Sequence, residues 1–255
     1  MSHALELFGF TISMYFLSSI VGIIFAMGLA LLRSRATRFH TSAEDIFFTV
    51  LCCVIGALLG AKVFQLMGNI ILDGGNPGFW TLENWQGMLP GVGVFYGGLI
   101  GGFFLGLLYV CKSRLDAWEV IDIVVPSVPM FHILGRLGCF FVGCCYGHIS
   151  NSSVAINGLI PVQLFEAGFN LLILVAMLFI CPERKQKGVL LPLYLMAYAT
   201  GRFVLEFFRG DVGRGIFLLS TSQWISLLVF PAGAILFLWT MRNNIAMYKT
   251  THPNK

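Results

Sequence analysis

Charged residues are scarce in this chain. Only 11% of its 255 residues are Asp, Glu, Lys or Arg, whereas 57% are hydrophobic. Soluble domains usually carry about 25% charged residues, so this scarcity excludes an ordinary water-soluble domain. The formal net charge is only +4, and the basic residues stand at the ends of apolar runs, which excludes a nucleic-acid-binding surface. Apolar runs long enough to cross a bilayer instead predict a polytopic membrane protein.

The pattern of a cleavable secretory signal is also missing. The first apolar run, residues 7–32, is too long for the hydrophobic region of a signal peptide, and no basic segment precedes it. We therefore expect this run to be retained as the first membrane span.

The apolar runs predict an all-α fold, a bundle of seven transmembrane helices. About twenty apolar residues cross a bilayer as a helix. The expected spans are residues 7–32, 46–72, 92–111, 121–145, 161–181, 189–209 and 221–241. Their even spacing and short loops predict one membrane-embedded domain over residues 1–255. In the fourth span, Pro126 and Pro129 are expected to kink the helix, and its glycine-rich end is expected to be irregular.

Basic residues alternate from one loop to the next. Lys and Arg gather in the loops after the first, third and fifth spans and in the C-terminal tail, whereas the opposite loops contain only Arg214. Cytoplasmic loops carry the excess of Lys and Arg in membrane proteins. The N-terminus is therefore predicted outside and the C-terminus in the cytoplasm.

The fourth span carries the most unusual side chains. His132, Arg136 and Cys139 are spaced four and three residues apart, so a helix places them on one face. An ionisable residue inside a bilayer is costly and by default indicates a functional site. Arg136 stays charged and needs an anion, for which a lipid phosphate is a natural choice. The structural alternative is a satisfied polar contact beside a packed thiol.

The sixth span repeats this spacing with Arg202, Glu206 and Arg209. Glu206 can pair with either arginine, which leaves the other arginine for an external anion. An internal salt bridge that ties helices together is the alternative, and both roles can hold at once. Glu166 begins the fifth span, where the helix macrodipole by itself favours an acid.

Tyr96 precedes the paired glycines Gly97 and Gly98 at the outer end of the third span. Glycines allow helices to approach closely, which is the structural interpretation of this segment. Its position also suits a lipid headgroup that approaches the backbone.

The cysteines all fall in or beside apolar runs. Four of them are expected to behave as small buried hydrophobes: Cys52, Cys53, Cys111 and Cys181. The other three, Cys139, Cys144 and Cys145, lie close together in the sequence. They lack the two cysteine pairs typical of zinc sites, so no metal site is predicted. A redox pair of Cys139 with Cys144 or Cys145 stays open as an alternative.

With these residues in view, residues 44–211 resemble the bacterial prolipoprotein diacylglyceryl transferase family. The similar motifs are Gly135-Arg136-Leu137-Gly138 with Gly143 and Gly147, Pro161-Val162-Gln163-Leu164-Phe165-Glu166, and Gly201-Arg202-Phe203 with Glu206, Arg209 and Asp211. The resemblance implies a multi-pass, seven-span enzyme of the bacterial cytoplasmic (inner) membrane without metal or organic cofactor. It implies transfer of the diacylglyceryl group of phosphatidylglycerol to the lipobox cysteine of a preprolipoprotein, with release of glycerol phosphate.

Several positions depart from the family pattern. Tyr96 stands where the family has a histidine, and Cys139, Val142 and Cys144 stand where it has two asparagines and a glutamate. The arginines that hold an anion are retained, whereas the residues that handle the proton differ. A tyrosine with an ordinary pKa near 10 is a poor base at neutral pH, and His132 is the nearest replacement.

The resemblance also implies roles for individual residues. Contacts to the phosphatidylglycerol headgroup are expected from Arg136, Arg202, Gly97, Gly98 and Gly147. Glu206 is expected to orient an arginine, and Tyr96 or His132 to handle the proton. Cys139 is a further catalytic candidate, as a nucleophile that His132 activates.

Two other functions are consistent with the same residues. One is a phospholipid-binding membrane protein that has lost the reaction. The other is a membrane thiol-redox protein that uses Cys139, Cys144 and Cys145. Within the transferase interpretation, a paralogue with a different thiol acceptor is a further variant.

Overall fold

A computed structural model describes residues 4–7, 10–37, 39–72, 92–180, 186–210, 215–216 and 219–251. The chain is mostly helical, with the elements α1 (Met14–Ala36), α2 (Ala43–Leu72), α4 (Val92–Lys112), α5 (Ala117–Val124), α6 (Ser127–Val142), α7 (Val162–Phe179), α8 (Leu190–Leu205), the 3-10 turn η2 (Glu206–Phe208) and α9 (Thr221–Thr251). Two short antiparallel hairpins, which were not predicted, pair β1 (Ala4–Leu7) with β2 (Phe10–Ser13) and β3 (Gly215–Ile216) with β4 (Leu219–Ser220). Cys181, Asp211 and Arg214 lie outside the described residues.

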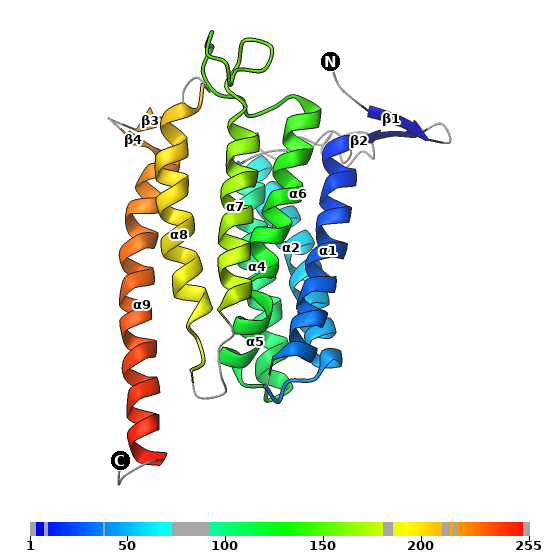
Figure 1. Cartoon of the computed structure of the whole chain (residues 1–255). Coiled ribbons are helices and arrows are strands. Elements are labelled where there is room, and N and C mark those ends of the chain that lie inside the picture. The colour runs from blue at the N-terminus through cyan, green and yellow to red at the C-terminus, as the bar shows by residue number, and fades with distance from the viewer. Residues whose placement is uncertain are drawn as a thin grey trace. The chain divides into compact units, whose positions relative to one another are not determined.

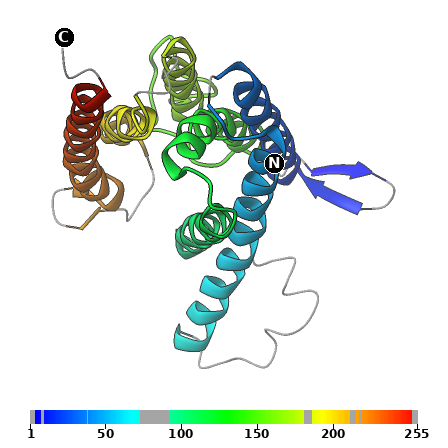
Figure 2. The ribbon, with the colours of Figure 1, turned by 90° about the horizontal axis from the view of Figure 1, so that it is seen from below.

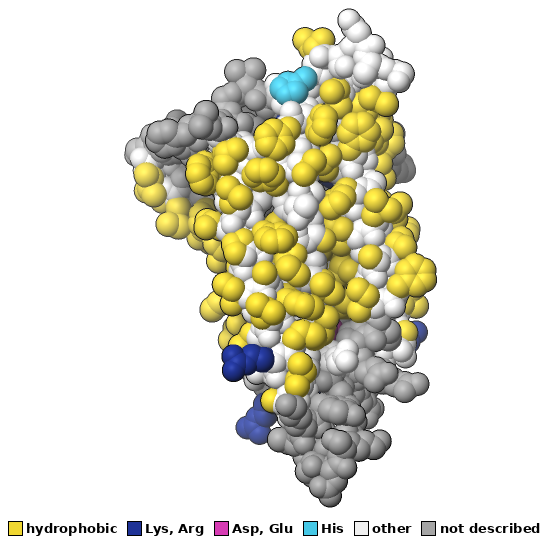
Figure 3. Space-filling view, turned by 60° about the vertical axis from the view of Figure 1, so that its left-hand side comes forward, with side chains coloured by type: hydrophobic (Ala, Val, Ile, Leu, Met, Phe, Trp, Pro, Cys, Tyr) yellow, Lys and Arg dark blue, Asp and Glu magenta, His cyan; other side chains and the backbone are white. Residues whose placement is uncertain are grey.

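Membrane-length helices dominate the described residues. Five of these helical segments are long and apolar enough to cross a membrane: Met14–Ala36, Ala43–Gly68, Ala117–Val142, Val162–Phe179 and Thr221–Ala246. Large apolar side chains point outward from them, and those of Leu172, Leu228 and Leu238 are 68%, 72% and 65% exposed. Figure 3 shows hydrophobic side chains across the middle of one face. Patches of this extent mark contact with a membrane or a partner, which confirms an α-helical membrane protein; the seven-span count stays a prediction.

The chain divides into two compact units, Met1–His40 with Ile121–Lys255, and Thr41–Val120. The prediction of one domain over the whole chain stays a prediction. In the larger unit, α1 packs on α6, α6 on α7, α7 on α8, and α8 on α9, in the order in which Figure 1 shows them.

The smaller unit is built on close packing between α2 and α4, which lie side by side (Figure 2). A Cβ atom on Gly60 would lie 2.2 Å from the carbonyl oxygen of Gly97, and one on Gly97 would lie 2.5 Å from the carbonyl oxygen of Gly60. Gly98 faces the same helix at a longer distance, 3.3 Å from the carbonyl oxygen of Ala57. Glycine is therefore required where the two backbones touch, as small residues are at interfaces between membrane helices.

The predicted fourth span is interrupted and shorter than expected. Helix α5 ends before Pro126, whose ring cannot continue a helix, and α6 begins at Ser127. Pro129 is tolerated because it lies in the first turn of α6. The helix ends at Val142 rather than at residue 145, because Gly143 adopts the left-handed conformation with φ 79° and donates its N–H to Cys139 and Phe140. The chain breaks before Pro126 where a kink was predicted, and Pro129 does not interrupt α6, whereas the irregular glycine-rich end is confirmed.

A buried carboxylate ties α5 to the start of α8. Asp122 accepts hydrogen bonds from the backbone N–H of Gly188 at 2.6 Å and of Leu190 at 3.1 Å. The residue before α8, Val189, makes no side-chain cap of its own. Asp122 therefore satisfies N–H groups that every helix leaves unpaired at its first turn, and it fixes the helix that carries Arg202.

Candidate active site

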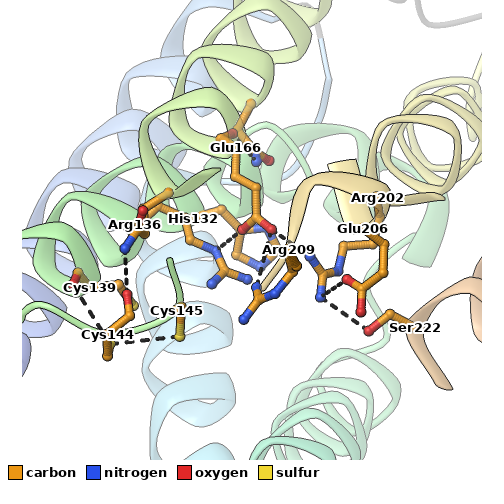
Figure 4. A network of polar contacts seen from close by, with 12 residues as sticks. His132, Arg136, Cys139, Cys144, Cys145, Glu166, Arg202, Glu206, Arg209 and Ser222 are labelled. Atoms are coloured by element: carbon orange, nitrogen blue, oxygen red, sulfur yellow. Dashed lines mark hydrogen bonds and ion pairs between the residues drawn. The ribbon is translucent and has the colours of Figure 1, made fainter. Parts of the chain in front are cut away.

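The centre of the site is the carboxylate of Glu166, in the first turns of α7. Its side chain forms ion pairs with Arg136 from α6 and with Arg202 from α8, and Arg209 Nη1 lies 3.5 Å from Glu166 Oε1 (Figure 4). Glu166 is only 4% exposed. A carboxylate out of water requires such partners, and three guanidinium groups share this one.

A second carboxylate supports Arg202 from the other side. Arg202 Nη2 lies 2.8 Å from Glu206 Oε2, at the (i, i+4) spacing predicted for this pair, and it donates to the Ser222 hydroxyl at 3.1 Å. Ser222 comes from the first turn of α9. Arg202 is therefore held by residues of two other helices, α7 and α9, and of η2.

The charges of this cluster do not cancel. Three arginines and two glutamates, namely Arg136, Arg202, Arg209, Glu166 and Glu206, leave one net positive charge. Arg136 has the most accessible of the three guanidinium side chains, 26% exposed against 12% for Arg202 and 3% for Arg209. A net positive cluster with one accessible planar fork of donors suits an external anion such as a phosphate.

Main-chain hydrogen bonds place Arg209. The segment after η2 runs beside the loop after α6: His148 N donates to Phe208 O at 3.1 Å, and Gly210 N donates to Tyr146 O at 3.3 Å. A Cβ atom on Gly147 would lie 2.4 Å from Phe208 O. Only glycine therefore allows the two backbone segments to lie this close. Gly147, predicted to contact the lipid headgroup, thus has a packing role; its contact to a headgroup stays a prediction.

The prediction that Arg209 shares a helical face with Arg202 and Glu206 is wrong. Helix α8 ends at Leu205, Glu206–Phe208 form a 3-10 turn, and Arg209 is extended with φ −78° and ψ 137°. This turn points Arg209 at Glu166 instead of along α8. One of these two arginines was expected to be left for an external anion. In the structure both Arg202 and Arg209 lie next to a carboxylate.

His132 lies one helical turn before Arg136, as predicted. Its Nδ1 is 3.4 Å from the Tyr194 hydroxyl, and its ring centre is 5.3 Å from that of Tyr198. Figure 4 shows the imidazole behind the guanidinium of Arg136 and close to the Glu166 cluster. The part of His132 in proton transfer stays a prediction.

The three clustered cysteines meet at the end of α6. The sulfur atoms of Cys139, Cys144 and Cys145 all lie within 4.8 Å of one another. Cys139 is buried in the last turn of the helix, whereas Cys144 and Cys145 are half-buried in the loop that follows. Gln163 donates to the Cys144 carbonyl at 2.5 Å and fixes this loop against α7.

The pKa values of the two loop cysteines, Cys144 and Cys145, shift in opposite directions. The pKa of Cys145 is lowered to about 5, first because the Cys139 thiol donates a hydrogen bond to the Cys145 thiolate, and further by the charge of Arg209. Burial raises the pKa of Cys144, and the neighbouring Cys145 raises it further. Of the two thiols, Cys145 is therefore the one that loses its proton more easily.

The structure therefore unites the predicted residues His132, Arg136, Arg202 and Glu206 in one unit, with Cys139 next to them. Tyr96, Gly97 and Gly98 belong to α4 in the other unit, so their part in this site stays a prediction. Sequence reasoning did not assign a role in the site to Glu166, and it offered Arg209 only as one of two arginines that could be left for an external anion. The signal that could have found Glu166 is its place as one of the few acids within the spans, since each buried guanidinium requires an anion.

The fold and this cluster define the class: an α-helical membrane protein with a buried, positively charged site. The family model described as prolipoprotein diacylglyceryl transferase matches residues 2–239. The chain therefore belongs to the prolipoprotein diacylglyceryl transferase family, a family of membrane transferases, which confirms the resemblance stated from the motifs.

Relatives of the chain carry the same description. The phosphatidylglycerol–prolipoprotein diacylglyceryl transferase of Clostridium tetani is 34% identical over 91% of this chain and 94% of its own length. A second enzyme of that name from Clostridium perfringens is 30% identical over 91% and 92% of the two chains. That of Bordetella bronchiseptica is 33% identical over 94% and 95%. The similarity thus spans both compact units.

Proposed function

We propose that this protein transfers the diacylglyceryl group of phosphatidylglycerol to the cysteine thiol of a prolipoprotein. The observation that carries the proposal is the convergence of Arg136, Arg202 and Arg209 on the buried Glu166, with one positive charge in excess. Phosphatidylglycerol brings one phosphate, whose negative charge complements this excess. The relatives named for this reaction support the same substrates.

Arg136 is the expected phosphate ligand, because its guanidinium is the most accessible of the three. Arg202 and Arg209, which are more deeply buried, add positive potential behind it. Charge grows on the phosphate oxygen as the glycerol phosphate leaves, and preorganised donors stabilise such charge strongly in a site without water. Glu166 and Glu206 position the arginines and do not themselves contact the reacting atoms.

The proposed step is a displacement at carbon. The acceptor sulfur forms a bond to the glycerol carbon of the diacylglyceryl group while the bond from that carbon to the phosphate oxygen breaks. The electron pair leaves with glycerol phosphate, and a base takes the proton of the acceptor thiol. His132 is the expected base, next to Arg136 and the Tyr194 hydroxyl, with Tyr96 as the other candidate. Cys139 is the remaining catalytic candidate, as a nucleophile rather than a base. Unchanged transfer by Cys139→Ser would exclude that role.

The membrane arrangement proposed with this function has seven spans, an outer N-terminus and a cytoplasmic C-terminus in a bacterial inner membrane. Each predicted span overlaps a helix of the structure, with the fourth made of α5 and α6. Two of the seven, α4 and α8, are not among the five helical segments that are long and apolar enough to cross a membrane. The alternation of basic loops supports the orientation, which would bring the end of α6 to the outer side.

The test is transfer by the purified full-length protein in detergent micelles. Labelled phosphatidylglycerol and a lipobox peptide are the substrates, and the labelled peptide and free glycerol phosphate are both measured. Arg136→Ala should abolish transfer, whereas Arg35→Ala, at an exposed arginine of α1, should leave it intact. A protein that binds phosphatidylglycerol without any transfer would instead be the non-catalytic lipid-binding protein, and the proposal would be wrong.

A further inference from the structure

Transfer does not account for the group of cysteine thiols at the end of α6. Cys139 is a candidate nucleophile, but the proposed reaction needs neither Cys144 nor Cys145. The resembled family has polar side chains rather than thiols at two of these three positions. Yet the three sulfur atoms lie within 4.8 Å of one another.

The backbone at one of these thiols, Cys145, adopts a strained conformation. Cys145 has a φ of 66°, the left-handed region that residues with a side chain rarely adopt. Such a conformation persists when the surroundings determine it, and it is concentrated at functional sites. Here Gln163 holds the Cys144 carbonyl, and the next residue, Tyr146, accepts the N–H of Gly210 at 3.3 Å. These contacts turn Cys145 back toward Cys139.

The charge around the thiols favours an anionic complex. Arg209 makes a hydrogen bond to the Cys145 sulfur, and the charge of Arg136 acts on both Cys139 and Cys144. A monovalent cation bound by three thiolates carries a net charge of −2, from one positive and three negative charges. The neighbouring arginine cluster, with its one net positive charge, would offset part of this charge.

We infer that Cys139, Cys144 and Cys145 form a three-thiolate binding site for a soft, low-coordinate metal ion of the Cu(I) type. Thiolates select soft metals such as Cu(I). Among the described residues, no fourth His, Cys, Asp or Glu joins the group, which disfavours the four-ligand arrangement of structural zinc. The thiols release their protons as the metal–sulfur bonds form.

This inference departs from the expectation of no metal site, which rested on the sequence spacing of zinc ligands. A last helical turn followed by a left-handed residue folds three thiols together without two separate cysteine pairs. The half-buried Cys144 and Cys145 leave the site open from the loop. The inference is independent of lipid transfer, because metal binding can be measured on an inactive protein.

The experiment compares two complementary variants of the full-length protein in detergent. One replaces the clustered cysteines with serine, namely Cys139, Cys144 and Cys145. The other keeps the cluster and replaces the four remaining cysteines, namely Cys52, Cys53, Cys111 and Cys181. Each is titrated anaerobically with Cu(I) against a chromophoric Cu(I) chelator, and thermal unfolding checks that both variants are folded. Zn(II) is titrated in parallel.

The variant that keeps the cluster should bind a single Cu(I) as tightly as the unchanged protein, with a sulfur-only, three-coordinate shell in X-ray absorption. Loss of an outer-shell partner alone costs about 10–100-fold in metal affinity, so the cluster-free variant should lose at least that much. If it does not fold, the single change Cys145→Ser at a half-buried position makes the same comparison. Equal Cu(I) retention by the compared variants, preference for Zn(II), or a disulfide within the freshly reduced cluster would overturn the inference.

Discussion

Glu166→Gln removes one charge from the centre of the arginine cluster and nearly preserves the size of the side chain. Glu166 is 4% exposed and is the common partner of Arg136, Arg202 and Arg209. The substitution raises the net charge of the cluster from +1, with three arginines and two glutamates, to +2. Three guanidinium groups that shared a carboxylate then repel one another.

The magnitude follows from burial and from the remaining partners. Removing one member of a buried ion pair destabilises a protein by about 3–5 kcal/mol. Arg136 is 26% exposed and can recover some hydration, and Arg202 retains Glu206 and Ser222. We therefore expect the free energy of unfolding to fall by about 3 kcal/mol, at the lower end of that range.

The assay is chemical unfolding in detergent micelles, followed by tryptophan fluorescence. Glu44→Gln makes the same chemical change at an exposed position of α2, where the effect should stay within about 0.5 kcal/mol. If Glu166→Gln unfolds no more easily than Glu44→Gln, the carboxylate does not hold the arginines together and the reasoning is refuted.

Three other predictions test the site and the packing. Arg136→Lys should lower lipid transfer by about 100-fold, because an ammonium lacks the planar fork; activity equal to the unchanged protein would contradict this. Gly60→Ala should lose about 1–3 kcal/mol in thermal unfolding because its Cβ would meet the backbone of α4 at 2.2 Å. Gly68→Ala, with no atom within 4 Å, should gain about 0.5–1 kcal/mol, and equal shifts would argue against close packing. Cys145 should be alkylated near neutral pH and lose reactivity as the pH falls through about 5, where its thiolate is protonated, whereas Cys144 should react only at alkaline pH; identical pH profiles by mass spectrometry would exclude this assignment.

The helices could be predicted because apolar length is a strong signal in a membrane protein. Their ends were less predictable, since they depend on single residues. Gly143 ends α6 by its left-handed conformation, and the first helix begins at Met14 rather than at residue 7 because Ala4–Leu7 and Phe10–Ser13 pair as strands. An apolar run does not distinguish a helix from such a hairpin at its edge.

The sequence predicted only those parts of the site in which neighbouring residues belong to the same helical segment. Spacing placed His132 beside Arg136, and Arg202 beside Glu206, as the structure has them. The meeting of arginines from α6, α8 and the segment after η2 at Glu166 depends on how separate helices pack, which spacing does not contain. The direction of Arg209 depends on a 3-10 turn that the continuous apolar pattern concealed.

The peptide groups that hold the segment of Arg209 beside the loop after α6 are the same for every residue type. Except at Gly147 and Gly210, where a Cβ atom has no room, these main-chain hydrogen bonds place no demand on neighbouring side chains. Side chains of the loop after α6 can therefore be exchanged without moving the main chain that carries Arg209. A scaffold of this kind lets the side chains at positions 139 and 144 change while Arg209 keeps its place beside Glu166.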